Sequence, residues 1–451
     1  MDKTKISNIK FSINTLGCKT NQSESDYIAN CLVEKGYQFV SYNNRPQISI
    51  INTCTVTSES DRKARQLIRR IKQVNPDIKI IVTGCFTVFN KEFLTGSNNN
   101  SIMVVDNEDK YKIPDIVSKI AGKPQLDANN SDICCLDAIS LDAGHTETNF
   151  THSRPFVKIQ DGCEQGCSYC IVPKVRGGYS STPSSLILKE VKELEKMDFE
   201  EVVLTGIHEG KYGVDLFNEK INSLPLLIEE ILKYSSIRRI RLSSIEINEI
   251  DSYFLKLIKN SDSRIANHLH IPLQSGSNRI LKLMNRHYTR EFYLDNVFFI
   301  KSLIPGVAIT TDVIVGFPGE TIKDFEETID VVKKIAFSKI HVFKYSPRIN
   351  TPASVMKGQL SNKVKSERSY ILRNLGNRLR EDYINSNIGR ILEVIYEKED
   401  KKERISSGTS ENYIKVYYPT QGKNKVAPVK GKLVRIRATS KFKDGLYGVL
   451  N

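Results

Sequence analysis

The sequence lacks any long apolar stretch. No run approaches the ~20 residues that a membrane-spanning helix needs. The first ten residues, MDKTKISNIK, carry no apolar segment after their lysines, so we expect no secretory signal. These two absences favour a cytoplasmic protein, in which thiols stay reduced. The nine cysteines are then predicted to be metal ligands and a few spare thiols rather than a set of disulfides.

Acidic residues are also few in comparison with basic ones. In 451 residues, 66 lysines and arginines oppose 52 aspartates and glutamates, and the net charge is +14. Such an excess suggests a polyanionic partner, of which nucleic acid is the commonest. The chain is too long for a single hydrophobic core, so we expect two or three domains.

Half of this excess charge lies at the C-terminal end. Residues 386–451 contain 14 Lys+Arg and 7 Asp+Glu, a net charge of +7. Short β-like runs at 391–398, 412–419 and 432–440 are divided by Gly, Pro and Asn turns. The pattern predicts a small basic β-barrel that binds RNA. The alternative is a lysine-rich β appendage whose charges are merely solvated.

The N-terminal part alternates between strand-like and helix-like segments. Apolar strand patterns occupy 9–18, 47–54 and 78–85, and helical patterns occupy 24–36 and 59–73. This alternation predicts a parallel sheet with crossover helices. The stretch that follows, 121–150, is acidic, rich in Asn, Ser and Asp, and weakly periodic, which indicates a domain linker.

The alternation resumes at about Arg154 and continues to about Leu379. Helical stretches such as 183–197 and 321–336 lie between six apolar strand patterns. The strand patterns occupy 155–160, 201–206, 237–244, 267–273, 307–316 and 339–345. Six βα units in series predict a barrel, or an open part of one. In such folds the chemistry collects at the C-terminal ends of the strands.

Three cysteines follow directly on the first strand of this predicted barrel. In DGCEQGCSYCIVP, Cys163, Cys167 and Cys170 are separated by three and then two residues. A structural zinc site would need a fourth Cys or His, and none lies nearby in the sequence. A four-iron cluster held by three thiolates instead leaves one iron open, which a small molecule can chelate. We therefore favour such a cluster, with zinc or plain structural cysteines as the alternatives.

The spacing Cys-x3-Cys-x2-Cys, with the aromatic Tyr169 before the last cysteine, resembles that of the radical S-adenosylmethionine enzymes. The resemblance implies a [4Fe–4S] cluster whose open iron binds the methionine part of S-adenosylmethionine. It also implies that electron transfer to this cofactor yields a 5′-deoxyadenosyl radical, which removes hydrogen from an unactivated C–H bond.

A second group of three cysteines is scattered in the sequence, but each member ends an apolar strand pattern. The three are Cys18, Cys54 and Cys85. Because the ends of parallel strands share one edge of a sheet, we expect these thiolates to converge on a second metal cluster. Two of them follow a glycine, which lets the backbone turn closely around a bulky ligand. The alternative is that they are ordinary buried cysteines. We interpret Cys31, in a helical pattern, and Cys134 and Cys135, in the linker, as non-ligands.

Two three-cysteine groups followed by a basic β module resemble the radical methylthiotransferases over nearly the whole chain. The resemblance implies an N-terminal α/β domain with a parallel sheet and an auxiliary [4Fe–4S] cluster, a central partial TIM-like (β/α)6 radical SAM barrel, and a small C-terminal β-barrel, the RNA-binding TRAM domain. One S-adenosylmethionine would donate a methyl group to a sulfur on the auxiliary cluster, and a second would supply the radical for methylthiolation. We divide the chain into domains at 1–122, 151–384 and 385–451, with a linker at 123–150.

Further motifs support this resemblance. HLHIPLQSGSNRILKLMNR and TDVIVGFPGET resemble family segments that seat S-adenosylmethionine, which implies this role for Gln274, Asp312 and Gly316. The segments VLTGIH and RLSS lie at strand ends that contact the amine and ribose of the cofactor. They add the candidates Gly206, Ser243 and Ser244. The alternative for each of these positions is a polar strand end that caps the next helix.

The first cysteine indicates the subfamily. LGCKTNQSES resembles the enzymes that act on N6-threonylcarbamoyladenosine at tRNA position 37, whereas relatives acting on isopentenyladenosine have Cys-Gln-Met-Asn and those acting on a ribosomal protein have Cys-Pro-Lys-Asn. The implied partners are a tRNA anticodon stem-loop and a reducing electron donor such as flavodoxin or ferredoxin. The sequence departs from the family pattern at several positions, among them Glu209, where an apolar residue is usual, and Asn350, where Gly is usual. The alternatives within the family are a methylthiotransferase that acts on isopentenyladenosine 37 or on a ribosomal protein. An alternative from another class is a non-catalytic iron–sulfur RNA-binding protein.

The segment after Cys54 is predicted to form a basic helix, which supports an RNA substrate. In DRKARQLIRRIKQV, one face is apolar and the other carries basic residues that could meet RNA phosphates or be solvated. The apolar positions are Ala64, Leu67, Ile68, Ile71 and Val74, and the outward ones are Arg62, Lys63, Arg65, Arg69 and Arg70.

Overall fold

The computed structural model describes residues 9–96, 101–122, 152–420 and 429–451. Most of the expected linker, with Cys134 and Cys135, lies outside the described residues. The chain forms two compact units. The first contains the chain up to residue 151 together with Gly162–Glu164 and Cys170–Gly178, and the second contains the remainder.

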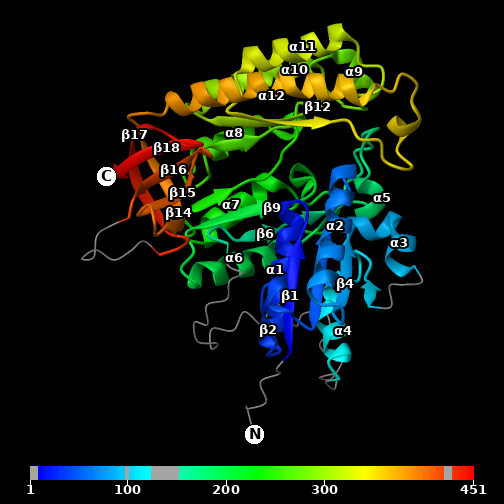
Figure 1. Cartoon of the computed structure of the whole chain (residues 1–451). Helices are drawn as coiled ribbons and strands as arrows, with labels where there is room; N and C mark the ends of the chain where they lie inside the picture. The colour runs from blue at the N-terminus through cyan, green and yellow to red at the C-terminus, as the bar shows by residue number, and fades with distance from the viewer. Residues whose placement is uncertain (1–8, 97–100, 123–151, 421–428) are drawn as a thin grey trace. The chain divides into compact units, whose positions relative to one another are not determined.

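The first unit is built on a five-stranded sheet in which every pair of neighbours is parallel. The strand order is β2-β1-β3-β4-β5. The blue ribbons of Figure 1 include β1, β2 and β4 of this sheet. The strands are β1 Lys10–Thr15, β2 Gln38–Phe39, β3 Ile48–Thr53, β4 Lys79–Gly84 and β5 Ile102–Val104. The helices are α1 Lys19–Glu34, α2 Ser58–Val74, α3 Lys91–Thr95 and α4 Ile113–Ile120. The expectation of a parallel sheet with crossover helices is confirmed.

Helices cover both faces of this sheet because alternate strand residues point to opposite sides. On one face Phe11 and Ile50 pack with apolar residues of α1 and α4. On the other face Ile51 and Val82 pack with the apolar stripe of α2. This stripe contains Ala64, Ile68 and Ile71, which are buried, as the sequence predicted.

The second unit contains six parallel strands in two three-stranded sheets, ordered β10-β9-β6 and β11-β12-β13. A parallel bridge between Ile240 and Ile265 continues the first sheet toward the segment before β11. The strands are β6 Phe156–Lys158, β9 Glu201–Thr205, β10 Arg239–Arg241, β11 His268–His270, β12 Ala308–Val315 and β13 Lys339–Lys344. A short antiparallel pair, β7 Gln160–Asp161 and β8 Ser180–Ser181, follows the first strand. The six expected strands are all present, and the expectation of a partial (β/α)6 barrel is confirmed.

Helices pack on the outer side of these strands. They share one hydrophobic core with alternate strand residues such as Leu204, Ile240, Leu269 and Val313. The helices of this unit are α6 Ser184–Lys196, α7 Leu224–Tyr234, α8 Ser252–Lys259, α9 Asn278–Leu283, α10 Arg290–Leu303, α11 Ile322–Ile335 and α12 Asn362–Asn385. The short helix α5 Val172–Arg176 belongs to the first unit. No helix in the described part of the chain is long and apolar enough to cross a membrane.

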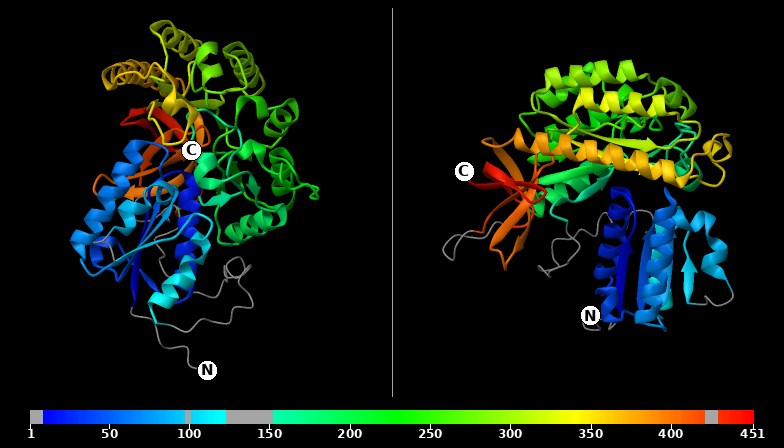
Figure 2. Two further views of the ribbon diagram at one scale, coloured as in Figure 1. Left: turned by 90° about the vertical axis from the view of Figure 1, so that its right-hand side faces the viewer. Right: turned by 45° about the horizontal axis from the view of Figure 1, so that its top comes forward.

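A closed five-stranded barrel follows the C-terminal end of α12, as the orange and red ribbons of Figure 2 show. Its strands are β14 Ile391–Asp400, β15 Ile405–Ser410, β16 Lys415–Pro419, β17 Leu433–Phe442 and β18 Gly445–Leu450. The order is β14-β15-β16-β18-β17, and pairing of β17 with β14 closes the barrel. The small C-terminal β-barrel is therefore confirmed, although the sequence patterns did not identify β15 and β18.

Two buried arginines of β10 form ion pairs with β9 and attach this barrel through hydrogen bonds to its backbone. The carboxylate of Glu201 accepts hydrogen bonds from Arg239 and Arg241, and all three side chains are buried. Arg239 also donates to the backbone carbonyl of Glu393 at 2.9 Å, and Arg241 donates to that of Ser410 at 2.9 Å. The barrel and the sheet β10-β9-β6 are thus joined by two buried arginines that donate to main-chain carbonyls of the barrel.

Candidate cluster and cofactor sites

The three scattered cysteines of the first unit converge at the C-terminal edge of its sheet. Cys54 follows β3 directly, Cys85 follows β4 directly, and Cys18 precedes α1. A Cβ atom placed on Gly17 would lie 3.0 Å from the Cβ of Cys54. Burial raises the pKa of the Cys54 thiol, and charge on Cys85 and Cys18 raises it further. The three thiols are therefore close enough to interact electrostatically, as expected for residues at adjacent strand ends.

The surroundings of these thiols can stabilise negative charge. Burial raises the pKa of Cys85, whereas the guanidinium of Arg176 and the amide of Asn107 lower it. The Nδ2 of Asn107 lies 3.8 Å from the sulfur of Cys85, and the thiol of Cys18 donates to Asn21 Oδ1 at 3.0 Å. Three adjacent thiols with a buried cation beside them are a donor set that fits an iron–sulfur cluster.

The glycine before Cys85 is required by its neighbouring strand. Gly84 has a φ of 92°, and an added Cβ would lie 2.3 Å from the backbone oxygen of Thr53. From the sequence, this glycine was explained by the close approach of a ligand. The described contact is instead between the backbones of β4 and β3, since Gly84 and Thr53 are register partners.

The other cysteine group lies on the loop after β7, and the loop is divided between the units. Cys163 and Cys170 belong to the first unit and Cys167 belongs to the second. All three are partly exposed. The backbone N–H of Cys163 donates to the carbonyl of Gly177 at 3.1 Å. A Cβ on Gly162 would lie 1.7 Å from the oxygen of Gly178, so only glycine fits before Cys163.

Cys167 lies beside a cation within the second unit. The Nη1 of Arg286 is 3.5 Å from its sulfur, and Arg286 also forms an ion pair with Glu246. Burial opposes the charge of this arginine, but Tyr288 and Glu246 raise its pKa well above the usual value. A guanidinium that stays charged favours the thiolate form of Cys167, which is the form that binds metal.

Three of the residues predicted to contact S-adenosylmethionine lie at the ends of β9 and β10. The backbone N–H groups of Gly206 and Ser243 both donate to the buried carboxylate of Glu209, at 3.2 and 3.0 Å. Ser244 is the half-buried neighbour of Ser243. Glu209, at a position where the family usually has an apolar residue, therefore holds these two strand ends together. In the sequence, Glu209 is noticeable only because it departs from the usual family pattern.

The other three predicted cofactor residues lie along β12. Gln274 has a φ of 61° and pairs with β12, because its N–H donates to the carbonyl of Asp312 at 2.8 Å. Gly316 follows β12 with a φ of 74°, and its N–H donates to Glu320 at 2.7 Å. The structure thus brings the six residues into two groups, one at each three-stranded sheet.

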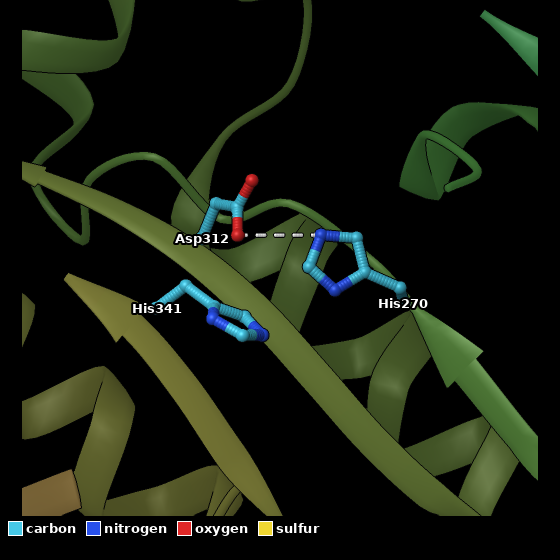
Figure 3. A group of neighbouring side chains, drawn as sticks. All are labelled: His270, Asp312 and His341. Atoms are coloured by element: carbon cyan, nitrogen blue, oxygen red, sulfur yellow. Dashed lines mark ion pairs between the residues drawn. The ribbon is translucent and has the colours of Figure 1, made fainter. Parts of the chain in front are cut away.

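Sequence reasoning missed a group of side chains inside the second sheet. His270, Asp312 and His341 come from β11, β12 and β13, and their ligand-type atoms all lie within 4.8 Å of one another (Figure 3). Burial, followed by the charge of Lys339, lowers the pKa of His341 to about 4, although Asp312 acts in the opposite direction. The sequence predicts Asp312 as a contact of S-adenosylmethionine but gives no role to the two histidines, although polar residues alternate in HLHIP and ITTDV.

Two basic surfaces are present. On α2, the exposed basic residues are Arg62, Lys63, Arg69 and Arg70, and Arg65 is half-buried. The guanidinium groups of Arg65 and Arg70 lie over the rings of Phe86 and Tyr42, respectively. On the barrel, lysines surround Tyr417 in a groove of about 470 Å³, and the ammonium groups of Lys415 and Lys443 lie 5.1 and 5.8 Å from the ring centre. The groove is lined by Lys398, Glu399, Asp400, Lys401, Lys402, Glu403, Ile405, Ser407, Lys415, Tyr417 and Lys443.

Comparison with known proteins gives consistent matches. Residues 157–332 match the sequence model of the radical SAM superfamily, and residues 10–106 match that of uncharacterized protein family UPF0004. The chain is 38% identical over 410 residues to a threonylcarbamoyladenosine tRNA methylthiotransferase of Bacillus subtilis, covering 90% of each protein. It is 38% identical to the Aquifex aeolicus protein of the same name, covering 95% of this chain and 100% of that one.

More distant matches agree with the fold. A tRNA-2-methylthio-N6-dimethylallyladenosine synthase of Acetivibrio thermocellus is 32% identical over 437 residues, which cover 95% of this chain and 88% of that protein. Among solved structures, the radical S-adenosylmethionine methyltransferase TsrM from Kitasatospora setae superposes with a TM-score of 0.54 at 13% identity, covering 77% of each chain. At that identity the likeness concerns the fold alone.

Proposed function

The chain belongs to the methylthiotransferase family of radical S-adenosylmethionine enzymes, and we propose that it adds a methylthio group to C2 of N6-threonylcarbamoyladenosine at position 37 of tRNA. The observation that carries the proposal is the full-length match, at 38% identity, to relatives named for this substrate. The Cys18–Asn21 sequence, Cys-Lys-Thr-Asn, favours the same subfamily.

The cofactors of this chemistry are S-adenosylmethionine and two [4Fe–4S] clusters. We assign the cluster that binds S-adenosylmethionine to Cys163, Cys167 and Cys170. We assign the auxiliary cluster to the group formed by Cys18, Cys54 and Cys85. When bound, these groups would supply the methyl group, the sulfur site and the radical that removes hydrogen from a C–H bond that is neither acidic nor otherwise easily substituted.

The residues of the chain itself prepare the two sites electrostatically. Arg176 places positive charge beside Cys85, and it shares the buried carboxylate of Glu24 with Lys110. Arg286 does the same for Cys167. Glu209 fixes the ends of β9 and β10, where Gly206 and Ser243 would meet the cofactor. Gln274, Asp312, Gly316 and Ser244 complete the proposed cofactor set.

The tRNA would present its anticodon stem-loop, in which base 37 is single-stranded and can be splayed into a pocket. Lys63 and Arg69 on α2 and the lysine groove around Tyr417 are the surfaces that favour a polyanion. We keep the division into domains at 1–122, 151–384 and 385–451. A flavodoxin or ferredoxin is the proposed electron donor.

The second candidate substrate is the isopentenyl (dimethylallyl) form of adenosine 37, because several relatives named for it are 30–33% identical over nearly the whole chain. The deciding experiment offers the reconstituted enzyme both modified tRNAs and identifies the nucleosides by mass spectrometry. We expect the methylthio product only from the threonylcarbamoyl substrate. Product only from the isopentenyl substrate would reverse the subfamily assignment, and product from neither would contradict the RNA substrate itself.

A control in cells complements this test. Deleting the gene should remove the methylthio derivative of threonylcarbamoyladenosine from total tRNA, and the wild-type gene should restore it. A gene carrying the Cys163→Ala substitution should not restore it, because the cluster that cleaves S-adenosylmethionine would lose one of its three protein ligands.

A further inference from the structure

The inner surface of β11, β12 and β13 carries a group of side chains of metal-binding types, of which only Asp312 has a role in the proposed function. Asp312 and His341 are register partners on adjacent strands, and His270 is the register partner of Thr310. The residues that alternate with them face the helices. These are Leu269, Ile309, Val313 and Val342, which are buried in the core shared with the helices. The period of two therefore places His270, Asp312 and His341 on the face away from the helices.

The spacing of these side chains fits a small metal ion. The Nε2 of His270 is 3.4 Å from Oδ1 of Asp312, drawn as the dashed line in Figure 3. A tetrahedral ion with ligand bonds of about 2.1 Å has edges of about 3.4 Å, so this pair can act as ligands without moving. The imidazole rings of His270 and His341 meet edge to face, with centroids 5.9 Å apart. His341 closes the group, since its ring nitrogen lies within 4.8 Å of the other two ligand atoms.

A second observation concerns the other nitrogen of His270. Its Nδ1 lies 2.9 Å from the hydroxyl oxygen of Thr310. Metal-binding histidines almost always donate their second ring N–H to such a partner, which fixes the tautomer and the ring orientation. Donation from Nδ1–H to Thr310 leaves the lone pair of Nε2 directed at the space beside Asp312.

We propose that His270, Asp312 and His341 bind one divalent transition metal ion of the Zn²⁺ type inside the barrel. Two imidazoles and one carboxylate are a ligand set that leaves at least one coordination position open. That position would take an oxygen atom of water or of a bound ligand. The proposal rests on geometry and is independent of the proposed tRNA substrate. Asp312 has two carboxylate oxygens, so a metal bond through one leaves the other for S-adenosylmethionine.

Neighbouring charges oppose the ion only in part. Lys339 and Arg380 both act on His341 in the direction that disfavours positive charge. The carboxylate of Asp444 is a negative group close enough to act on both of these cations. The two imidazole ligands should select Zn²⁺ over Mg²⁺ and Ca²⁺, because those ions prefer oxygen.

The test uses the full chain with both clusters reconstituted, equilibrated with one equivalent of Zn²⁺ and then desalted. We expect about one zinc per chain, with nitrogen and oxygen neighbours at about 2.0–2.1 Å by X-ray absorption at the zinc edge and no sulfur at about 2.3 Å. Zinc edges are separate from those of the cluster iron. His341→Ala should weaken zinc binding at least about tenfold. Thr310→Val should weaken it about 10- to 100-fold, because His270 would lose the hydrogen-bond partner that orients its ring.

The matched control is His287→Ala, because His287 is exposed and lies outside this group. It should retain full zinc binding. Circular dichroism and iron content should stay unchanged in every variant, which separates loss of the site from loss of the fold. Less than about a tenth of a zinc per chain in the wild type, a sulfur shell around the zinc, or full zinc binding by a folded His341→Ala chain would each overturn the proposal.

Discussion

The guanidinium of Arg176 lies 2.9 Å from the carboxylate of Glu24, and neither side chain is more than 2% exposed. Lys110 reaches the same carboxylate at 2.7 Å. Arg176 follows Cys170 closely in sequence, whereas Glu24 belongs to α1, which begins after Cys18. The ion pair therefore attaches the segment after Cys170 to helix α1, which begins directly after Cys18.

Replacing Arg176 by Met should weaken this unit. Breaking a buried ion pair by removing one partner typically costs 3–5 kcal/mol, and because Lys110 still neutralises Glu24 we expect about 2–3 kcal/mol. The free energy of unfolding, measured with urea on the cluster-free chain, tests this. Lys112→Met is the control, since Lys112 is an exposed partner of Asp109 and its removal should change stability by less than about 0.5 kcal/mol. Equal stability of both variants would show that the Arg176–Glu24 pair does not form in solution.

Iron content should separate the two clusters. Anaerobically reconstituted and chelator-washed protein should hold about eight irons, as two cubes require. Replacing Cys163, Cys167 and Cys170 by Ala should halve the iron and abolish 5′-deoxyadenosine formation. Replacing Cys18, Cys54 and Cys85 should also halve the iron but leave some cofactor cleavage.

The control for these triple variants is Cys31→Ala. Cys31 is buried in α1 and lies outside both cysteine groups, so its replacement should leave the iron content unchanged. Full iron and normal product from the variant lacking Cys18, Cys54 and Cys85 would refute the assignment of the auxiliary cluster.

Binding of tRNA should depend on the lysines of the barrel groove. Replacing Lys401, Lys402 and Lys415 by Ala should weaken binding, and it should reduce the slope of log affinity against log salt by about one for each lysine that neutralises a phosphate. Cofactor cleavage should stay unchanged, because these side chains are remote in sequence from both cysteine groups. The control is Lys334→Ala, because the side chain of Lys334 is exposed on α11 and lies outside the groove. An unchanged salt slope in the triple variant would remove the groove from the tRNA interface.

Point substitutions are preferable to deleting the barrel. Deletion of residues 386–451 should also weaken tRNA binding far more than cofactor cleavage. It would, however, remove the main-chain acceptors of Arg239 and Arg241, whose charges are buried. A truncated chain would therefore lose stability for a reason unrelated to RNA.

Stability at acid pH should depend on Glu201. Burial alone would raise its pKa, but Arg239 and Arg241 dominate and lower it to about 2. Because the pKa in the folded chain lies below the unfolded value of about 4.3, this contribution to stability is complete above pH 4.3 and is lost as the pH falls toward 2. Glu201→Gln should lower the free energy of unfolding at pH 7 by about 3–5 kcal/mol and flatten its decline below pH 4.3.

Urea unfolding of the cluster-free chain between pH 7 and pH 3 measures this effect. The control is Glu326→Gln, at an exposed position of α11, which should follow the wild-type curve. An acid decline in Glu201→Gln as steep as in the wild type would assign the effect to other carboxylates.

The sequence predicted the elements whose signal is local. Apolar runs that end in cysteine indicated β3 and β4, and the period of the apolar residues indicated the buried face of α2. Asn350 stands where glycine is usual in the family pattern, and its φ is 64°, a conformation that Asn tolerates better than most residues. By contrast, β15 has the sequence ISSGTS, whose small polar residues carry no apolar alternation, and it becomes a strand through pairing with β14 and β16.

The missed features depend on partners that are distant in sequence. Glu201 is one of many glutamates until the fold places Arg239 and Arg241 beside it. Glu209 was noted only as unusual, because nothing in its neighbourhood shows that Gly206 and Ser243 will donate to it. His270 and His341 become neighbours only through the register of β11, β12 and β13. Local periodicity indicates which face of a helix or strand a residue occupies. It does not indicate which charged side chains from other elements will lie beside it.

Arg239 and Arg241 hold the C-terminal barrel by its main-chain carbonyls, at residues 393 and 409–411. Every residue type offers the same carbonyl, so the attachment places little demand on which amino acids the barrel contains. Mutations on the outer surface of the barrel can accumulate without breaking the hydrogen bonds that Arg239 and Arg241 donate to it. The barrel, which we propose meets RNA, is therefore free to diverge, or to be exchanged for another barrel of the same backbone geometry, while the rest of the chain keeps its sequence.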